Sequence, residues 1–354
     1  MKKQIIYVFI LSFFILCHNS YSQKEKKSDR SEQVTQLFKS QKVLPIKLGF
    51  SCKSIKKETN DSTYIKTNIS YKTEDGTWDS FELELRVRGN NRLNNCYFPP
   101  IKMKIEKADS KGTLFEGNKK LKLVFPCLTN KDKNDYIVKE YMAYKLYEII
   151  SIYHYNTRMV EISFTDDKGK KTKTYDLKGI LIEDDKKVAK RHGGNVVKNR
   201  FIHPMAQDPV TSVQNSFFQF MIGNTDFSTF VQHNEKILYV DKLFAPLPYD
   251  FDMSGLVNTS YSVVSVINNE PLPISSVRER MYRGFKRDPI IIQQVRNEFL
   301  DNKFKMFEIV DSLEPLFDDP KEFSQAKNYI STFFEIIAND YRYGQEITDR
   351  LRTK

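Results

Sequence analysis

The stretch PLPYDFDMSG, residues 246–255, places two carboxylates two positions apart in the chain. In an extended segment the side chains of Asp250 and Asp252 share one face, where they repel each other unless a cation or hydrogen-bond donors lie between them. A hard divalent ion meets this need, because Mg²⁺ binds through one or two carboxylates together with phosphate oxygens. The alternative is a pair of turn-capping residues before Ser254 and Gly255. We therefore treat Asp250 and Asp252 as candidate metal ligands.

A second polar stretch, MIGNTDFSTFVQHNEKIL, joins an expected buried helix to an expected strand. It carries Asn224, Asp226, His233 and Asn234. Gly, Asn, Thr and Asp in a loop often serve turn formation alone, which is the alternative here. The density of polar groups between two apolar elements favours a functional loop instead.

Two earlier segments carry residues that suit phosphate binding. LRVRGNNR ends an expected strand with Arg88, Gly89 and Asn90, and the next expected strand, PPIKMKI, carries Lys102 and Lys104. Gly and Asn accept positive φ, so a simple hairpin turn is the alternative. The functional interpretation is a turn that covers phosphate groups, with a Lys on the returning strand.

Glu140 lies in the expected helix DYIVKEYMAYKLYEII among largely apolar neighbours. A helical Glu normally belongs to a solvated face, but a half-buried Glu requires a cation, which a strand Lys can supply. The order along the chain is then a Gly turn, a strand Lys, a helix Glu, a polar loop and an Asp-Phe-Asp. Protein-kinase-like phosphoryl transfer uses its parts in this order.

Hydrophobic patterns indicate the elements that must position these residues. From 44 to about 125 the chain alternates as strands, most clearly in FELELRVRG, whose four apolar residues share one face. One long helix, further strands, a buried helix at 213–222 and two short strands follow, and helices dominate from 275 onward. This order predicts an α+β fold, with a β-rich part at 44–185 that contains one helix and a mainly helical part at 186–354.

The first residues have the pattern of a secretory signal. Lys2 and Lys3 precede an apolar run from Ile5 to Leu16, and small residues follow. We predict a signal peptide at 1–22 and a flexible, polar leader at 23–43. The apolar run is short for a transmembrane anchor, and no later stretch is apolar enough to span a membrane. The mature chain is therefore expected to be exported, to the periplasm or the cell exterior.

Three cysteines follow the predicted signal, and an oxidising compartment permits one disulfide. We expect Cys96 to pair with Cys127, since both lie in tight, Pro-flanked segments, and this leaves Cys52 as a thiol. The formal net charge is +11, but most Lys residues are scattered or lie in loop-like runs. No nucleic-acid-binding motif is present in the sequence, so no nucleic-acid partner is expected.

These stretches together resemble the CotH-type kinases, the family of the spore-coat protein H, which are distant members of the protein-kinase-like fold. The resemblance covers residues 80–260 and rests on RGN, PPIKMKI, KEYMAYKLYE, GNTDFSTFVQHN and PLPYDFDMSG. The chain is also similar to a group of exported Bacteroidetes proteins with the same GNTD and PYDFD stretches. The resemblance implies an atypical two-lobe kinase-like fold, with ATP and Mg²⁺ or Mn²⁺ as cofactors.

The resemblance assigns roles to the two Asp-containing stretches. Asp226 matches the catalytic Asp, Asn234 matches the metal-binding Asn of the catalytic loop, and Asp252 or Asp250 matches the metal Asp of the Asp-Phe-Gly position. Two departures stand out. Asn234 lies eight residues after Asp226 instead of five, and Phe227–Ser228 replaces the Arg-His usual in this family.

The resemblance also assigns roles to the N-terminal candidates. Lys102 or Lys104 matches the phosphate Lys, with Glu140 as its partner. The turn at Arg88, Gly89 and Asn90 would cover the nucleotide, although it holds one Gly instead of three.

The function predicted from this order is metal-dependent phosphoryl transfer from a nucleotide to a hydroxyl of a protein or small molecule, by an exported kinase-like protein. ATP is scarce outside the cytoplasm, which is the main physical objection. The first alternative is a non-catalytic exported protein that binds a surface partner or glycan. The second is a metal-dependent hydrolase, but two-metal sites need more carboxylate or His ligands than these stretches provide.

Overall fold

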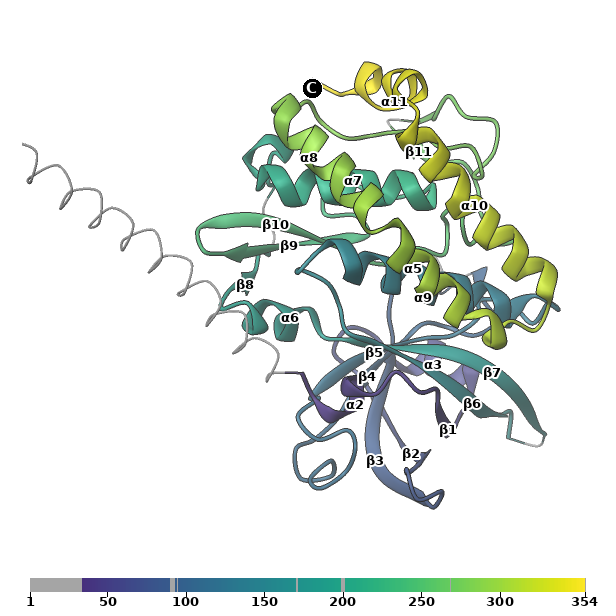
Figure 1. Cartoon of the computed structure of the whole chain (residues 1–354). Helices are drawn as coiled ribbons and strands as arrows, with labels where there is room; N and C mark the ends of the chain where they lie inside the picture. Colours follow the sequence, from purple (N-terminus) through teal and green to yellow (C-terminus); the bar gives the residue numbers. More distant parts are fainter. Residues whose placement is uncertain are drawn as a thin grey trace, which may run out of the picture.

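The computed structural model describes residues 34–89, 93, 95–169, 171–198, 201–267 and 269–353 of the 354-residue chain. The predicted α+β class is confirmed, since strands dominate the first half of the chain and helices the second (Figure 1). Two hydrophobic cores accompany this division, one inside a barrel and one among the helices. The predicted signal peptide lies outside the described residues.

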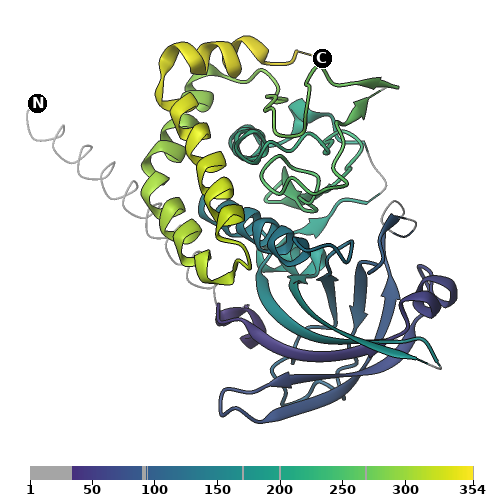
Figure 2. The same cartoon turned by 90° about the vertical axis from the view of Figure 1, so that its right-hand side faces the viewer.

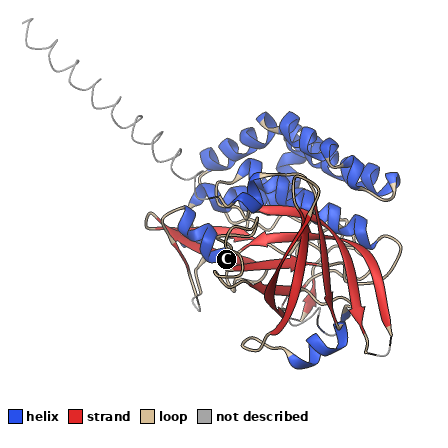
Figure 3. Cartoon of the chain, turned by 90° about the horizontal axis from the view of Figure 1, so that it is seen from below, coloured by secondary structure: helices blue, strands red, loops and turns tan. Residues whose placement is uncertain are grey.

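Seven strands close into a barrel in the order β1-β2-β3-β4-β5-β7-β6. β1 pairs with β6 in parallel, and the other neighbours are antiparallel. Seen from below, the strands curve around one another beneath the layer of helices (Figure 3). The strand bounds are β1 (Leu44–Phe50), β2 (Ile65–Lys72), β3 (Trp78–Val87), β4 (Ile101–Lys104), β5 (Lys120–Val124), β6 (Thr157–Asp167) and β7 (Thr172–Glu183).

Alternate residues along the strands are apolar, and their side chains fill the inside of the barrel. The four apolar residues of FELELRVRG are buried, as their spacing predicts, and they join the barrel core. β5 lies inside the region 44–125 that is predicted to form strands, but it was not recognised as a separate strand, because its sequence KLKLV is short. A short helix, α3 (Cys52–Glu58), is a second helix in the part that was expected to contain one.

Helix α5 (Lys133–Ile150) runs along the boundary between the barrel and the other helices (Figures 1 and 2). It packs against β6 and β7 on one side and against α7, α9 and α10 on the other. Burial on both sides explains its apolar and aromatic residues all round the axis. Its charged residues Lys139, Glu140 and Lys145 are buried with it, so each needs a partner inside the protein.

The second half of the chain holds most of the helices. Three of them begin with Asp followed by Pro, and the Asp side chain accepts a hydrogen bond from a backbone N–H of the first turn in each case. The helix bounds are α6 (Asp185–Arg191), α7 (Pro209–Ile222), α8 (Pro289–Asp301), α9 (Lys303–Ser312), α10 (Pro320–Ala338) and α11 (Asp340–Glu346), with short 3₁₀ helices η1 (Pro204–Ala206), η2 (Glu314–Leu316) and η3 (Thr348–Arg350).

Two small sheets complete the described fold. β8 (Asn195–Val196), β9 (Glu235–Val240) and β10 (Leu243–Pro248) form one, and β11 (Val266–Ile267) and β12 (Glu270–Pro271) form the other. β9 and β10 are the pair of short strands that the sequence predicts between the two polar stretches.

The predicted flexible leader is wrong for its described part. Residues 34–43 include helix α2 (Gln36–Lys39), whose Leu37 and Phe38 are buried in the barrel core. Arg158 of β6 fixes this segment by donating hydrogen bonds to the carbonyl oxygens of Leu37 and Lys42. The apolar pair in an otherwise polar segment was the signal for this packing.

Cys96 and Cys127 form a disulfide, which confirms the predicted pairing. Cys52 is a buried thiol, as predicted. Burial raises the pKa of this thiol to about 12, which opposes formation of a reactive thiolate. In the part of the chain that the structure describes, no helix is both long and apolar enough to cross a bilayer.

Candidate functional site

The open end of the β9–β10 hairpin brings Asn234 and Asp250 together. Glu235 of β9 pairs with Pro248 of β10, and the Tyr249 N–H donates to the Asn234 carbonyl at 3.0 Å. Asn234 and Asp250 therefore leave the hairpin from neighbouring positions. Both have left-handed backbones, with φ values of 50° and 66°. Only a few per cent of residues other than Gly adopt this conformation, so two at one hairpin end require tertiary support.

The support at Asp250 comes from α5 and α7. The backbone N–H of Asp250 donates to the Tyr144 hydroxyl of α5 at 3.0 Å. Phe251 is fully buried, with its ring 4.7 Å from the ring of Tyr144 and 5.3 Å from that of Phe218 on α7. Asp252 is also buried and accepts a hydrogen bond from the Tyr261 hydroxyl at 2.9 Å. The two carboxylates thus lie in different surroundings, which their equal spacing in the sequence did not reveal.

The polar loop after α7 holds Asp226 beside Asn234. The Asn234 Nδ2 donates to the Asp226 Oδ2 at 2.9 Å and to its carbonyl oxygen at 2.8 Å. His233 Nε2 lies 3.0 Å from Asp226 Oδ1. The carboxylate raises the pKa of His233 through this hydrogen bond, against a smaller opposing effect of burial.

Four of the residues between Asp226 and Asn234 form a small turn that projects from the loop. Ser228 and His233 exchange two backbone hydrogen bonds of 3.0 Å, so residues 229–232 project from the loop as a turn. The remaining path from Asp226 to Asn234 is short, and their side chains meet. The insertion noted in the sequence therefore does not separate these two residues.

Gly223 links this loop to the segment after Asp252. It ends α7 with φ of 63°, and a Cβ there would lie 1.9 Å from the Tyr329 hydroxyl oxygen. The N–H of Gly255 donates to the Gly223 carbonyl at 3.0 Å. The requirement for Gly at 223 is thus both conformational and steric.

Lys122 of β5 is a candidate residue that the sequence interpretation missed. It is buried, and its Nζ lies 4.5 Å from the ring centroids of both Tyr155 and Tyr249. Burial lowers the pKa of Lys122 to about 8, and the charges of Asp185 and Asp184 oppose this decrease. A buried Lys with a pKa near neutrality is typical of functional sites, although structural networks also produce one. The alternation of KLKLV places Lys120 and Lys122 on one face of β5 but does not reveal that Lys122 alone of the two is buried.

Arg88, Glu140 and Asp250 gather around Tyr144, since the charges of all three act on its hydroxyl group. The charge of Arg88 acts on Lys122, on Tyr144 and on Tyr249. Glu140 is buried on α5, one helical turn before Tyr144. The boundary between barrel and helices therefore gathers a basic group from β5, one from the end of β3, a Glu from α5 and an Asp from the hairpin.

The other predicted phosphate-binding residues lie in less suitable positions. Lys104 forms salt bridges with Glu84 and Glu106 on the barrel surface, so the expected pairing with Glu140 is wrong for this Lys. Lys102 lies directly opposite Lys122 in the β4–β5 register, where its charge acts on Asp184. Gly89 has φ of 71°, as a turn residue requires, and Asn90 lies outside the described residues.

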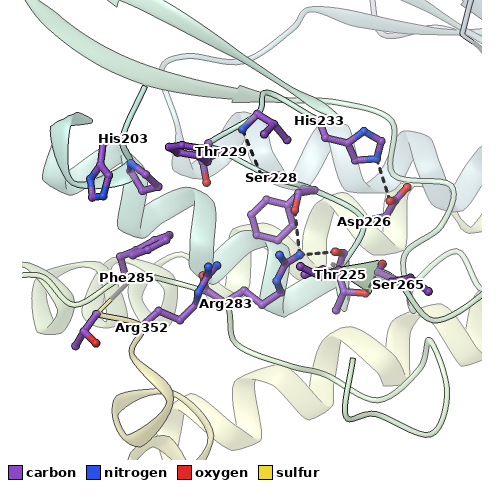
Figure 4. A pocket seen from close by; sticks show the side chains of 17 residues that line it. His203, Thr225, Asp226, Ser228, Thr229, His233, Ser265, Arg283, Phe285 and Arg352 are labelled. Carbon is purple, nitrogen blue, oxygen red and sulfur yellow. Dashed lines mark hydrogen bonds and ion pairs between the residues drawn. The ribbon is translucent and has the colours of Figure 1, made fainter. Parts of the chain in front are cut away.

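A cavity of about 780 Å³ lies on the other side of Asp226 (Figure 4). Its wall includes Asp226 and His233 at one end, Arg283 in the middle and Arg352 at the far end. Further polar residues of the lining are His203, Thr225, Ser228, Thr229, Ser265 and Thr353. The apolar part of the lining consists of three aromatic side chains, Phe227, Phe230 and Phe285, together with Pro204, Val231, Val266 and Ile267.

Among the residues that the structure describes, no group of three or more His, Cys, Asp and Glu side chains is arranged to hold a metal ion. The predicted metal ligands are an Asn and one or two Asp residues, a set that Mg²⁺ completes with phosphate and water oxygens. A comparison with protein-family models finds no family that matches the chain, and a search of curated proteins finds no matching relative.

Proposed function

We propose that this protein is a kinase-like phosphoryl transferase that binds a nucleoside triphosphate with Mg²⁺ or Mn²⁺. The observation that carries the proposal is the pair of left-handed residues at the hairpin end, Asn234 and Asp250, with Asp226 bonded to Asn234. In protein kinases an Asn of the catalytic loop and the Asp of an Asp-Phe-Gly segment hold the metal ions, and a second Asp faces the acceptor hydroxyl. The CotH-like resemblance and the two-lobe interpretation are part of this proposal.

The hairpin geometry favours Asp250 over Asp252 as the main metal ligand. The left-handed backbone of Asp250 is held by the Tyr144 hydroxyl and places this residue next to Asn234 at the end of the hairpin. Asp252 is held by Tyr261 and lies beyond the anchored Phe251. In this assignment Asp252 supports the loop and Asp250 faces the phosphates.

The residues present fit a divalent cation with a nucleotide. The hydrogen bonds of the Asn234 side chain to other described residues come from its Nδ2, which leaves the amide oxygen to face a cation. The bound ion would neutralise charge on the nucleotide phosphates. Lys122 and Arg88 would add positive charge on the barrel side, and Glu140 would orient them. Lys122 replaces Lys102 and Lys104 as our first candidate for the phosphate Lys.

Asp226 would accept the proton of the acceptor hydroxyl. Its side chain is 30% exposed, so an acceptor can approach it from the 780 Å³ cavity. His233 and Asn234 hold its two carboxylate oxygens, which fixes the side chain without burying it. Positioning and electrostatic stabilisation supply most of the catalysis in such sites.

One observation favours the alternative of a non-catalytic binding protein. The ammonium group of Lys122 contacts two aromatic rings, Tyr155 and Tyr249, where a nucleotide-binding Lys would contact phosphate. Such contacts stabilise a buried cation and leave it less accessible to a ligand. A protein that keeps this scaffold for binding alone would show the same arrangement.

Thermal stability with ligands separates the two functions. We expect ATP with Mg²⁺ or Mn²⁺ to raise the Tm of the wild-type protein, since a ligand at a hundred times its Kd adds about 2.7 kcal/mol to the stability. Asp250→Asn should abolish the shift, because Asn removes the charge yet tolerates the left-handed backbone. Asp252→Asn should reduce it less.

The matched control is Asp241→Asn, at the tip of the same hairpin. Asp241 also has a left-handed backbone, with φ of 49°, and it is exposed. Its Asn variant should keep the full ligand shift. If neither metal with ATP shifts the Tm of the wild type, the phosphoryl-transfer proposal is wrong and the binding protein takes its place.

A further inference from the structure

The cavity beside Asp226 has a charge pattern that the proposed function does not require. Arg283 and Arg352 line it, and neither forms a salt bridge with any acid among the described residues. Asp226 is at the opposite end from Arg352 (Figure 4). The charge of Asp226 acts on Arg283, but no acid is shown to act on Arg352 among the described residues. An acceptor site for an uncharged hydroxyl compound or a basic peptide would not need this second arginine.

Arg283 presents its guanidinium from the segment before α8. Nη1 donates to the carbonyl oxygens of Thr225 and Phe227, which flank Asp226. Both of its hydrogen bonds to the described residues use Nη1, so Nε and Nη2 are left to face a ligand. The guanidinium also lies 5.0 Å from the ring centroid of Phe227.

Arg352 is held at the cavity by its backbone. Its N–H donates to the Gly284 carbonyl at 3.0 Å, and its carbonyl accepts from the Lys286 N–H at 2.8 Å. Its guanidinium stacks over Phe285 at 4.4 Å from the ring centroid. The side chain is exposed and donates one long hydrogen bond, of 3.5 Å, from Nη1 to the Arg283 carbonyl oxygen, so Nε and Nη2 remain for a ligand. Arg on an aromatic ring is well suited to bind a carboxylate or phosphate through two parallel hydrogen bonds.

The size and lining of the cavity narrow the ligand class. Its volume, about 780 Å³, falls within the range of roughly 300–1,000 Å³ that is typical of small-molecule sites. Aromatic walls at Phe227, Phe230 and Phe285 offer flat apolar faces between the polar ends. A compound of sugar size, with hydroxyls and one anionic group, matches both the walls and the ends.

We propose that this cavity is the acceptor site, and that its ligand is a small polyhydroxy compound bearing a carboxylate or phosphate. A hydroxyl faces Asp226, and the anionic group faces Arg352 and Arg283. The transfer step rests on the proposed function. In it the acceptor oxygen forms a bond to the γ-phosphorus of ATP, and the bond from that phosphorus to the β–γ bridging oxygen breaks. The hydroxyl proton passes to Asp226, and ADP leaves.

The test measures binding of three probes to the full chain by saturation-transfer NMR, without nucleotide or metal. The probes are glucuronate, which carries a carboxylate, glucose 6-phosphate, which carries a phosphate, and glucose, which carries no charge. We expect at least one anion to bind with a Kd below about 20 mM, and about tenfold more tightly than glucose. Which anion binds identifies the anionic group.

Two variants make the assignment specific to Arg352. Arg352→Gln should weaken binding of the anion about tenfold, since it removes a charged hydrogen-bond donor that faces the anionic group. Arg350→Gln removes the same charge two residues away, outside the cavity lining, and should leave the affinity unchanged. Arg352→Lys should retain part of the affinity. The Tm of each variant is measured to confirm folding.

Three results would overturn the cavity assignment: glucose binds as tightly as the anions, Arg352→Gln behaves like Arg350→Gln, or neither anion binds. These outcomes are separate from the fate of the proposed function. A Tm shift with metal and ATP but no anion binding refutes the cavity assignment alone. Anion binding that depends on Arg352, without a nucleotide shift, refutes phosphoryl transfer alone and favours an anion-binding protein.

Discussion

Glu235 occupies an unusual place for a carboxyl group, directly beside the metal-ligand candidate Asn234. It is fully buried at the start of β9, and its Oε2 accepts a hydrogen bond from Asn215 Nδ2 at 2.6 Å. Burial raises the pKa of Glu235 to about 8, and the Asn215 hydrogen bond only partly opposes this. Glu235 is therefore mainly protonated at neutral pH, which keeps a negative charge away from the inside of the hairpin.

This pKa makes the stability of the protein depend on pH. The folded-state pKa lies above the unfolded value of 4.5, so the stability linked to this proton is complete below pH 4.5 and is lost as the pH rises to about 8. Glu235→Gln keeps the acceptor for Asn215 and removes the ionisation. We expect the variant to raise the Tm at pH 8, by a stability gain on the order of 2 kcal/mol, and to change it little at pH 4.5.

Thermal unfolding of both proteins across this pH range provides the measurement. An exposed Glu270→Gln variant serves as the control and should follow the wild type. A difference between Glu235→Gln and wild type that is the same at every pH would show that Glu235 does not titrate in this window.

At the level of single residues, the sequence pointed to Asp226, Asn234 and Asp250 but did not reveal their environments. Asp226, Asn234 and Asp250 were all predicted, because their types and spacing are informative without a fold. The choice between Asp250 and Asp252 depends on a backbone angle and on the position of Tyr144, and neither can be read from spacing. Lys122 was missed for the same reason, since its burial between two tyrosine rings is a tertiary effect.

At the level of elements, helix α5 holds the backbone of Asp250 through one hydroxyl group, that of Tyr144. The Tyr144 hydroxyl accepts the Asp250 N–H, and the Tyr144 ring packs against Phe251. Tyr144 is buried and Asp250 is partly buried, so this hydrogen bond is largely shielded from water. The left-handed conformation of Asp250 therefore depends on the position of α5 against the hairpin.

Tyr144→Phe tests this dependence, because it keeps the ring and removes the acceptor. We expect a loss of stability of roughly 1–3 kcal/mol from the unsatisfied N–H. The metal-dependent ATP shift in Tm should shrink as well, since Asp250 is no longer held. Chemical denaturation and ligand-dependent thermal shifts measure the two effects.

Tyr141→Phe is the control on the same helix. The Tyr141 hydroxyl donates to Gln41 Oε1, at 3.2 Å and away from the hairpin. This variant should leave the ATP shift intact. An unchanged ATP shift in Tyr144→Phe would mean that α5 does not position Asp250.

Strand and helix periodicity predicted most of the elements that build the site. The strand FELELRVRG, helix 135–150, the buried helix before the polar loop and the two short strands after it all form where the pattern indicates them. Patterns did not reveal that the β9–β10 register would bring Asn234 and Asp250 together, or that a turn at 229–232 would absorb the longer loop. Both depend on pairings between segments, which periodicity along one segment does not encode.

For the molecule as a whole, the boundary between the barrel and the helices holds charged groups of the candidate site that lower the stability of the fold. A closed barrel supplies its own core, and the helices supply a second, so the boundary is free to hold charged groups. Lys122 is the clearest case, because it is buried there between Tyr155 and Tyr249. An apolar residue would suit these surroundings better unless a ligand requires the charge.

Substitution of Lys122 should therefore have opposite effects on the stability of the fold and on nucleotide binding. The folded-state pKa of Lys122, about 8, lies below the unfolded value of 10.5, so its charge destabilises the fold most below pH 8. Lys122→Met should raise the stability at pH 7 by on the order of 2 kcal/mol, and the gain should fade as the pH approaches 10.5. The same variant should lose the metal-dependent ATP shift, because the phosphates lose their cation.

Lys104→Met completes this experiment as a control on the neighbouring strand. The Lys104 side chain is 37% exposed and forms salt bridges with Glu84 and Glu106, so its loss should lower stability only slightly and leave the ATP shift unchanged. A Lys122→Met protein that gains stability and still shows the ATP shift would place Lys122 outside the nucleotide site. One that loses stability would show that the two tyrosine rings more than offset the cost of burying the charge, and that this Lys is retained for structure.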